Sequence, residues 1–244
     1  MNINNLLSGF LGSTAQGGDQ ASGQGGGVAQ AASGLMSNFP GGLAGGAAAG
    51  GVVAMLMGSK KARKIGGKAL TYGGLAVVGG LAYKAWSDYK ANQTNTAGAM
   101  SSPQAVPTPP ADSGFDPAHA IDHQGNDLRL TLVRAMISAA KADGHIDASE
   151  HDRIAEQIDA MALASDEKAF LFDQMRAASD PIAIATLAKD EPQATEIFLA
   201  SALAIDTDTP EERRYMDRLG DALRLPDALR VQLEDHANAA KQMG

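Results

Sequence analysis

Two short acidic turns carry the side chains of this sequence that have the chemistry to bind a metal ion. The first turn is Lys141-Ala-Asp-Gly-His-Ile-Asp-Ala-Ser-Glu150, and the second is Ala204-Ile-Asp-Thr-Asp-Thr-Pro-Glu-Glu-Arg213. Calcium is a hard cation that takes oxygen ligands, chiefly carboxylates and carbonyls. A divalent cation held by the two turns would use six acids: Asp143, Asp147, Glu150, Asp206, Asp208 and Glu212.

The first turn matches only the second half of a calcium-binding loop. With Gly144 at the sixth loop position, the three acids of the turn fall on ligand positions, but the first and third positions are Ala139 and Lys141. Neither of these side chains ligates a hard cation. Helix capping explains the same residues: Gly144 can end one helix in the left-handed conformation, and Asp147 and Glu150 have the spacing of a capping box. A cation site completed by other helices is a third alternative.

The second turn is expected to start a helix, with Thr209 as N-cap, Pro210 in the first turn and Glu212 completing a capping box. Asp180, which a proline follows, predicts another helix start of this kind. Apolar residues recur at helical spacing throughout residues 126–244, which predicts an all-α fold of about seven helices. A helix–acidic turn–helix pattern occurs twice, which suggests an internal pseudo-repeat.

The charge of the chain is divided unevenly along its length. Residues 1–111 hold seven lysines and arginines and two acids, a net charge of +5, whereas the rest holds 13 basic and 26 acidic residues, a net charge of −13. The acidic part argues against nucleic-acid binding, because phosphate contacts need clustered basic side chains. Cysteine is absent, which excludes disulfides and thiol catalysis.

The N-terminal part contains two glycine-rich apolar stretches, at 41–57 and 69–83, on either side of the basic run 60–64. The first stretch comes close to the length that spans a bilayer. One span, or a glycine-packed hairpin with the basic run at its tip, would fit a membrane, and a soluble helical hairpin is a rival interpretation. Residues 2–11 are predicted to form a short helix with one apolar face.

Composition divides the chain into four parts. We predict a disordered, low-complexity N-terminus, a membrane-associated segment, a flexible proline-, serine- and threonine-rich linker and a helical domain, at residues 1–34, 35–90, 91–125 and 126–244 respectively.

The two acidic turns resemble those of TerB-like, tellurite-resistance-type helical domains. Together with the glycine-rich apolar half, the whole chain resembles the bacterial domain-of-unknown-function family 533, the YebE-type inner-membrane proteins. The resemblance implies a TerB-like helical bundle, association with the inner membrane, a C-terminal domain in the cytoplasm and no established enzymatic activity. It also implies that the six acids named above are the candidates for metal binding.

We therefore expect a membrane-anchored, non-catalytic adaptor whose acidic helical domain binds a protein partner. No phosphate-binding glycine loop, nucleophilic-serine motif or small-molecule site is evident in the sequence. The expected partners are membrane lipid and an unidentified protein, with no nucleic acid and no cofactor. A module that responds to a divalent cation through the two acidic turns is the alternative.

Overall fold

The computed structural model describes residues 1–11, 62–93, 108–144, 154–156, 158–159 and 163–242. The described residues form helices and loops, and their one β-type pairing is an isolated bridge between Ile121 and Asp127. The all-α prediction is therefore confirmed for this part of the chain. The apolar stretch 41–57 lies outside the described residues, as does the part of the first acidic turn that holds Asp147 and Glu150.

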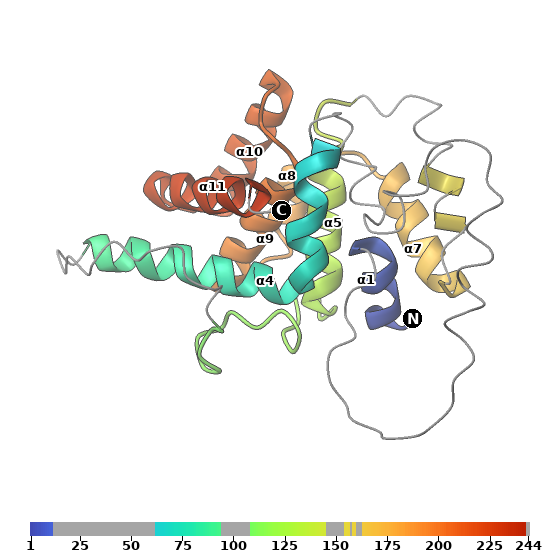
Figure 1. The fold of residues 1–244 in the computed structure, drawn as a ribbon, viewed down its shortest axis with the longest axis horizontal. Coiled ribbons are helices and arrows are strands. Elements are labelled where there is room, and N and C mark those ends of the chain that lie inside the picture. Colours follow the sequence, from blue (N-terminus) through green and yellow to red (C-terminus); the bar gives the residue numbers. More distant parts are fainter. Residues whose placement is uncertain (12–61, 94–107, 145–153, 157, 160–162, 243–244) are drawn as a thin grey trace.

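Eight helices of the described residues have both ends defined, and Figure 1 shows their arrangement. They are α1 (Ile3–Leu11), α4 (Ala62–Gln93), α5 (Leu128–Ala140), α7 (Ser165–Arg176), α8 (Pro181–Ala185), α9 (Glu191–Ala204), α10 (Pro210–Ala222) and α11 (Asp227–Gln242).

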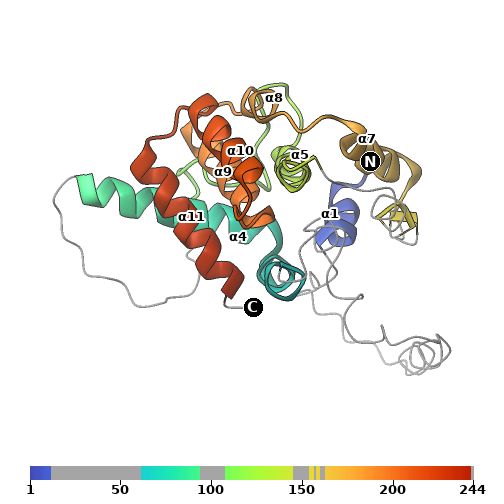
Figure 2. The same cartoon turned by 90° about the horizontal axis from the view of Figure 1, so that it is seen from above.

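Helix α9 is the centre of the core. Every residue from Gln193 to Ala204 is buried, and α4, α5, α10 and α11 all pack against this helix (Figures 1 and 2). A helix that is apolar around its whole circumference belongs in the interior, because any exposed face would leave apolar area in water. Helices α10 and α11 are amphipathic, and their apolar faces pack toward the core.

The ends of the helices follow local sequence signals. Asp180 accepts hydrogen bonds from the backbone N–H groups of Ile182 (2.9 Å) and Ala183 (3.1 Å), so the predicted cap of α8 is confirmed. Gly144 has a φ of +71°, the left-handed conformation predicted for the turn after α5. The helix predicted within residues 2–11 is also present, as α1.

Helix α4 packs into the helical body along its second half. Its side chains there pack against α9 and α11, and those that are buried are Leu75, Val78, Leu81, Ala82, Ala85 and Tyr89. Trp86 Nε1 donates a hydrogen bond to Glu191 Oε1 over 3.1 Å, and His236 Nε2 lies 3.7 Å from Asp88 Oδ2. The second half of α4 is therefore packed against the C-terminal helices.

Within the second apolar stretch, 69–83, the side chains of Leu75, Val78, Leu81 and Ala82 are buried in the protein. Figure 1 shows that α4 bends sharply along its length, and it carries three glycine pairs, which are common sites of helix kinks. Across the described ranges, no helix combines the length and the apolar content that crossing a bilayer requires.

The loop before α5 is packed onto α4. Phe115 is buried, and its ring centroid lies 5.6 Å from that of Tyr83 and 5.7 Å from that of Trp86. Asp122 is buried as well, and it accepts hydrogen bonds from the backbone of Asn126 and from the Thr131 hydroxyl, both over 2.8 Å. Residues 108–125 thus belong to the packed body, although the sequence predicted a linker there.

Candidate functional site

The second acidic turn is tied to the last helix by a buried lysine. Lys241 of α11 lies 3.2 Å from the Asp206 carboxylate and also donates a hydrogen bond to the carbonyl oxygen of Ile205, at the end of α9. Only 5% of Lys241 is exposed. Burial lowers the pKa of Lys241, and the ion pair with Asp206 opposes this shift. The carboxylate of Asp206 therefore already has a cation beside it.

Glu212 closes the capping box that the sequence predicts. Its Oε2 accepts hydrogen bonds from the Thr209 backbone N–H (3.1 Å) and hydroxyl (2.9 Å), and its own N–H donates to Thr209 Oγ1 over 3.2 Å. Burial raises the pKa of Glu212, the hydrogen bonds from Thr209 oppose this, and the nearby Asp208 raises it further. Glu212 thus acts as a helix cap in a partly buried position.

Arg213 connects the same turn to α11 at a second point. Its Nη1 lies 2.9 Å from Oε2 of Glu234, and its Nη2 donates to the Thr207 hydroxyl over 2.9 Å. The second turn is consequently held by two cations, Lys241 and Arg213, and its conformation depends on the position of α11.

In the first turn, Lys141 binds the end of another helix. Its ammonium group donates hydrogen bonds to the carbonyl oxygens of Gln174 (3.2 Å), Met175 (2.5 Å) and Ala177 at the C-terminus of α7. These are carbonyls that a helix leaves without partners, and a cation there is favoured by the helix dipole. Burial lowers the pKa of Lys141. Lys141, at the third position of the calcium-loop pattern, therefore stabilises the C-terminus of α7.

Of the six predicted metal ligands, the described part of the chain contains Asp143, Asp206, Asp208 and Glu212. It brings Asp208 close to Glu212, and it places Asp206 against Lys241. Among the described residues there is no group of three or more histidines and acids with the geometry to hold a metal ion. Cation binding by the two turns stays a prediction.

The most unusual polar group of the core is Glu196, in the middle of α9. Its side chain is completely buried, and neither carboxylate oxygen has a hydrogen-bond partner. Burial, and then the charges of Asp190 and Asp116, raise the pKa of Glu196 to about 8. The side chain is therefore mainly a neutral carboxylic acid at pH 7.

The backbone of α4 passes close to the Glu196 carboxyl group at Gly79. A Cβ atom built on Gly79 would lie 3.3 Å from Glu196 Oε1, 3.3 Å from the Phe115 carbonyl oxygen and 2.9 Å from Pro117 Cδ. Gly79 thus lets the backbone of α4 approach both α9 and the loop before α5. The contact joins the glycine-rich helix to the centre of the body.

Sequence reasoning did not select Glu196. The available signal was a single acid within the otherwise apolar and small residues that follow Gln193. Periodicity predicts that this helix is largely buried, but it does not indicate which element covers the acid. That information comes from α4, more than 100 positions earlier in the chain.

The sequence profile of a family described as "Protein of unknown function (DUF533)" matches residues 42–237, which is most of the chain. The chain belongs to the DUF533 family. The matched region runs from the first apolar stretch into α11, so that α4, Gly79 and Glu196 all lie inside it. Helix α1 precedes the matched region.

One relative of this DUF533 protein is an "Uncharacterized protein in ampR 5'region" from Yersinia enterocolitica. The two sequences are 30% identical over 111 residues, which is 46% of this chain and 80% of the relative. No solved structure matches this DUF533 protein.

Proposed function

We propose that this DUF533 protein is a non-catalytic adaptor that residues 41–57 hold at a membrane and whose helical body binds a protein partner. The observation that carries the proposal is the packing of α4 in the body. Because α4 begins at Ala62, only residues 58–61 separate it from the apolar stretch. A tether at 41–57 would therefore lead almost directly into a helix of the core.

The sequence around the tether supports a membrane role. Residues 35–57 carry no charge, and the basic run 60–64 follows. Basic residues beside an apolar segment favour the cytoplasmic side of a membrane and anionic headgroups. We infer that the helical body lies on the cytoplasmic side of a bacterial inner membrane, as the family resemblance implies.

The burial of α4 supports a single membrane segment over a hairpin. A second span through 69–83 would have to remove Leu75, Val78 and Leu81 from the core, where all three are buried. Lipid would also keep these side chains from water, so the loss would be their packing against α9 and α11 and the cavity left beside those helices. Residues 41–57 are thus the preferred tether.

The polar groups of the second acidic turn support binding rather than catalysis. Asp206 pairs with Lys241, and Glu212 caps α10, so that both carboxylates already have structural partners. Acids that hold a turn in one conformation present a fixed charged surface, which suits recognition of a partner.

An alkaline-carbonate wash of membranes tests the proposal. The full chain is compared with a chain that lacks residues 41–57 but keeps all of α4, so that the body is left intact. We expect the full chain to stay in the membrane pellet and the deletion to be released.

A matched variant separates insertion from surface attraction. Replacing the four basic residues of the run, Lys60, Lys61, Arg63 and Lys64, with glutamine should leave carbonate resistance unchanged. Release of the full chain by the wash would overturn the membrane part of the proposal.

A further inference from the structure

Helix α1 is a short helix that depends on the rest of the body. It has nine residues, and isolated helices of this length are unstable in water. Leu6 and Phe10 are completely buried in the hydrophobic core, while Ile3 and Leu7 are partly buried against it. The helix packs against α4. Its order must therefore come from docking.

Polar contacts define the position of α1 on its docking site. The backbone N–H of Asn2 donates to Glu167 Oε1 over 2.7 Å, and Asn5 Nδ2 donates to Glu167 Oε2 over 3.0 Å. Glu167 is completely buried at the start of α7, and it also accepts the Ala164 N–H over 2.8 Å. The carboxylate is thus fixed by the helix it caps, and α1 supplies two of its donors.

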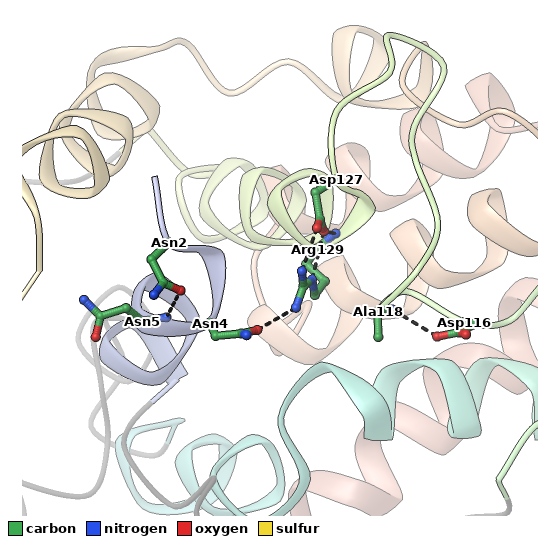
Figure 3. A network of polar contacts seen from close by, with 7 residues as sticks. All are labelled: Asn2, Asn4, Asn5, Asp116, Ala118, Asp127 and Arg129. Carbon is green, nitrogen blue, oxygen red and sulfur yellow. Dashed lines mark hydrogen bonds and ion pairs between the residues drawn. The ribbon is translucent and has the colours of Figure 1, made fainter.

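A second contact comes from α5. Arg129 Nη1 donates to Asn4 Oδ1 over 2.7 Å, and Figure 3 shows the two side chains meeting between α1 and α5. Asp127 holds the same guanidinium through two hydrogen bonds, 2.9 Å from Nε and 2.7 Å from Nη2. The α1 site, formed by Glu167, Arg129 and the adjoining face of α4, is therefore held in place by contacts that do not involve α1.

The connection between α1 and its site is long. Fifty residues, 12–61, separate the end of α1 from the start of α4. A fully extended chain of this length reaches roughly 170 Å, which is far enough to place α1 on a neighbouring molecule. All the contacts described above are made by residues 2–10, and a second copy of the chain carries the same residues.

We propose that the α1 site is a receptor for residues 1–11 of a second copy of this chain as well as for the chain's own α1, so that exchange of α1 links two copies. The inference does not depend on the proposed membrane tether. Docking within one chain is favoured at low concentration by the high effective concentration of a tethered segment. The fraction of copies that exchange α1 rises with protein concentration, for example when the protein is confined to a surface.

The absence of cysteine allows a direct test by cross-linking the full chain. One chain carries Asn4→Cys and a second, of distinguishable mass, carries Arg129→Cys. The two are mixed and treated with a short bis-maleimide reagent. We expect a covalent pair of the two chains whose yield rises with protein concentration and falls when the peptide of residues 1–11 is added.

Two controls make the result specific. Val231 is exposed on α11, so Val231→Cys replaces Arg129→Cys as a site away from α1 and should give no concentration-dependent pair. Adding Leu6→Asp to the Asn4→Cys chain should abolish the pair, with circular dichroism confirming that the body remains folded. The proposal is overturned if cross-linking occurs only within the Asn4→Cys/Arg129→Cys double variant, or equally with Val231→Cys.

Discussion

At the scale of single residues, Glu196 makes the stability of this protein depend on pH. An unpaired carboxylate in the core would cost several kcal/mol, so the side chain stays protonated in the folded state. In the unfolded chain the same group ionises near its usual pKa of 4.5. The unfolded state therefore loses a proton at a lower pH than the folded state, and the free energy of unfolding falls as pH rises between 4.5 and about 8.

We predict that Glu196→Gln makes the folded protein more stable at neutral pH. The folded protein loses about 1.4 kcal/mol of unfolding free energy per pH unit in this window, so the gain from Glu196→Gln at pH 7 should be on the order of 3 kcal/mol. Urea unfolding of the parent and of Glu196→Gln from pH 5 to pH 8 measures this gain in unfolding free energy. The difference should grow with pH, whereas Asp217→Asn, at an exposed acid on α10, should leave the pH dependence unchanged. Equal slopes for Glu196→Gln and the parent would contradict the assignment.

Thr209 offers a second residue-scale test, at the start of α10. Thr209→Ala removes the side-chain cap and should cost about 1 kcal/mol of unfolding free energy. Thr209→Ser keeps a hydroxyl in the same position and should recover most of the loss. If serine and alanine prove equally destabilising, the hydroxyl is not the stabilising group.

At the scale of elements, the packing of α4 on the body depends on close contact at a glycine as well as on the burial of apolar side chains. Gly79 lies where a side chain would contact Pro117, Phe115 and Glu196. The proline ring and the Phe115 carbonyl are stiff groups, so neither can move aside easily. Close approach of α4 to the loop before α5 therefore favours glycine at this position.

We predict that Gly79→Ala destabilises the protein. Helix propensity alone would make this substitution stabilising by about 1 kcal/mol. Overpacking typically costs about 1–3 kcal/mol. Because the new Cβ would lie 2.9 Å from Pro117 Cδ, we expect overpacking to outweigh propensity and the free energy of unfolding to fall. Asn92→Ala, at an exposed position of α4, tests propensity without the contact and should be neutral or stabilising. Chemical unfolding measures both variants, and a stabilised Gly79→Ala would show that α4 can shift without cost.

At the scale of the whole molecule, residues far apart in the sequence form one core. Helices α1 and α4 contribute buried side chains to the same cluster as α5, α9, α10 and α11. A tether followed by an independent domain would instead show two cores with few contacts between them. The described part of the protein should accordingly unfold as one unit.

The position of the sole tryptophan, Trp86, allows this to be measured. Trp86 lies on α4 beside Phe115 and Glu191, so its fluorescence reports the docking of α4. We predict that the urea transition followed by Trp86 fluorescence coincides with the transition followed by far-ultraviolet circular dichroism. A fluorescence transition at clearly lower urea would show that α4 leaves the body before the body unfolds.

Local features of this fold were predictable from the sequence because their causes lie within a few residues. Asp180 caps α8 through N–H groups two and three positions away, and Thr209 and Glu212 cap each other across three positions. Gly144 adopts its left-handed conformation for the same local reason. The all-α class follows from periodicity that extends over single helices.

The position of α4 and the surroundings of Glu196 were not predictable in this way. A glycine-rich apolar stretch can enter lipid or pack against protein, since both remove apolar area from water, and periodicity does not distinguish them. The pairing of Asp206 with Lys241 spans 35 positions, and the approach of Gly79 to Glu196 spans more than 100. Such contacts depend on the simultaneous packing of several helices around α9, which no short pattern in the chain encodes.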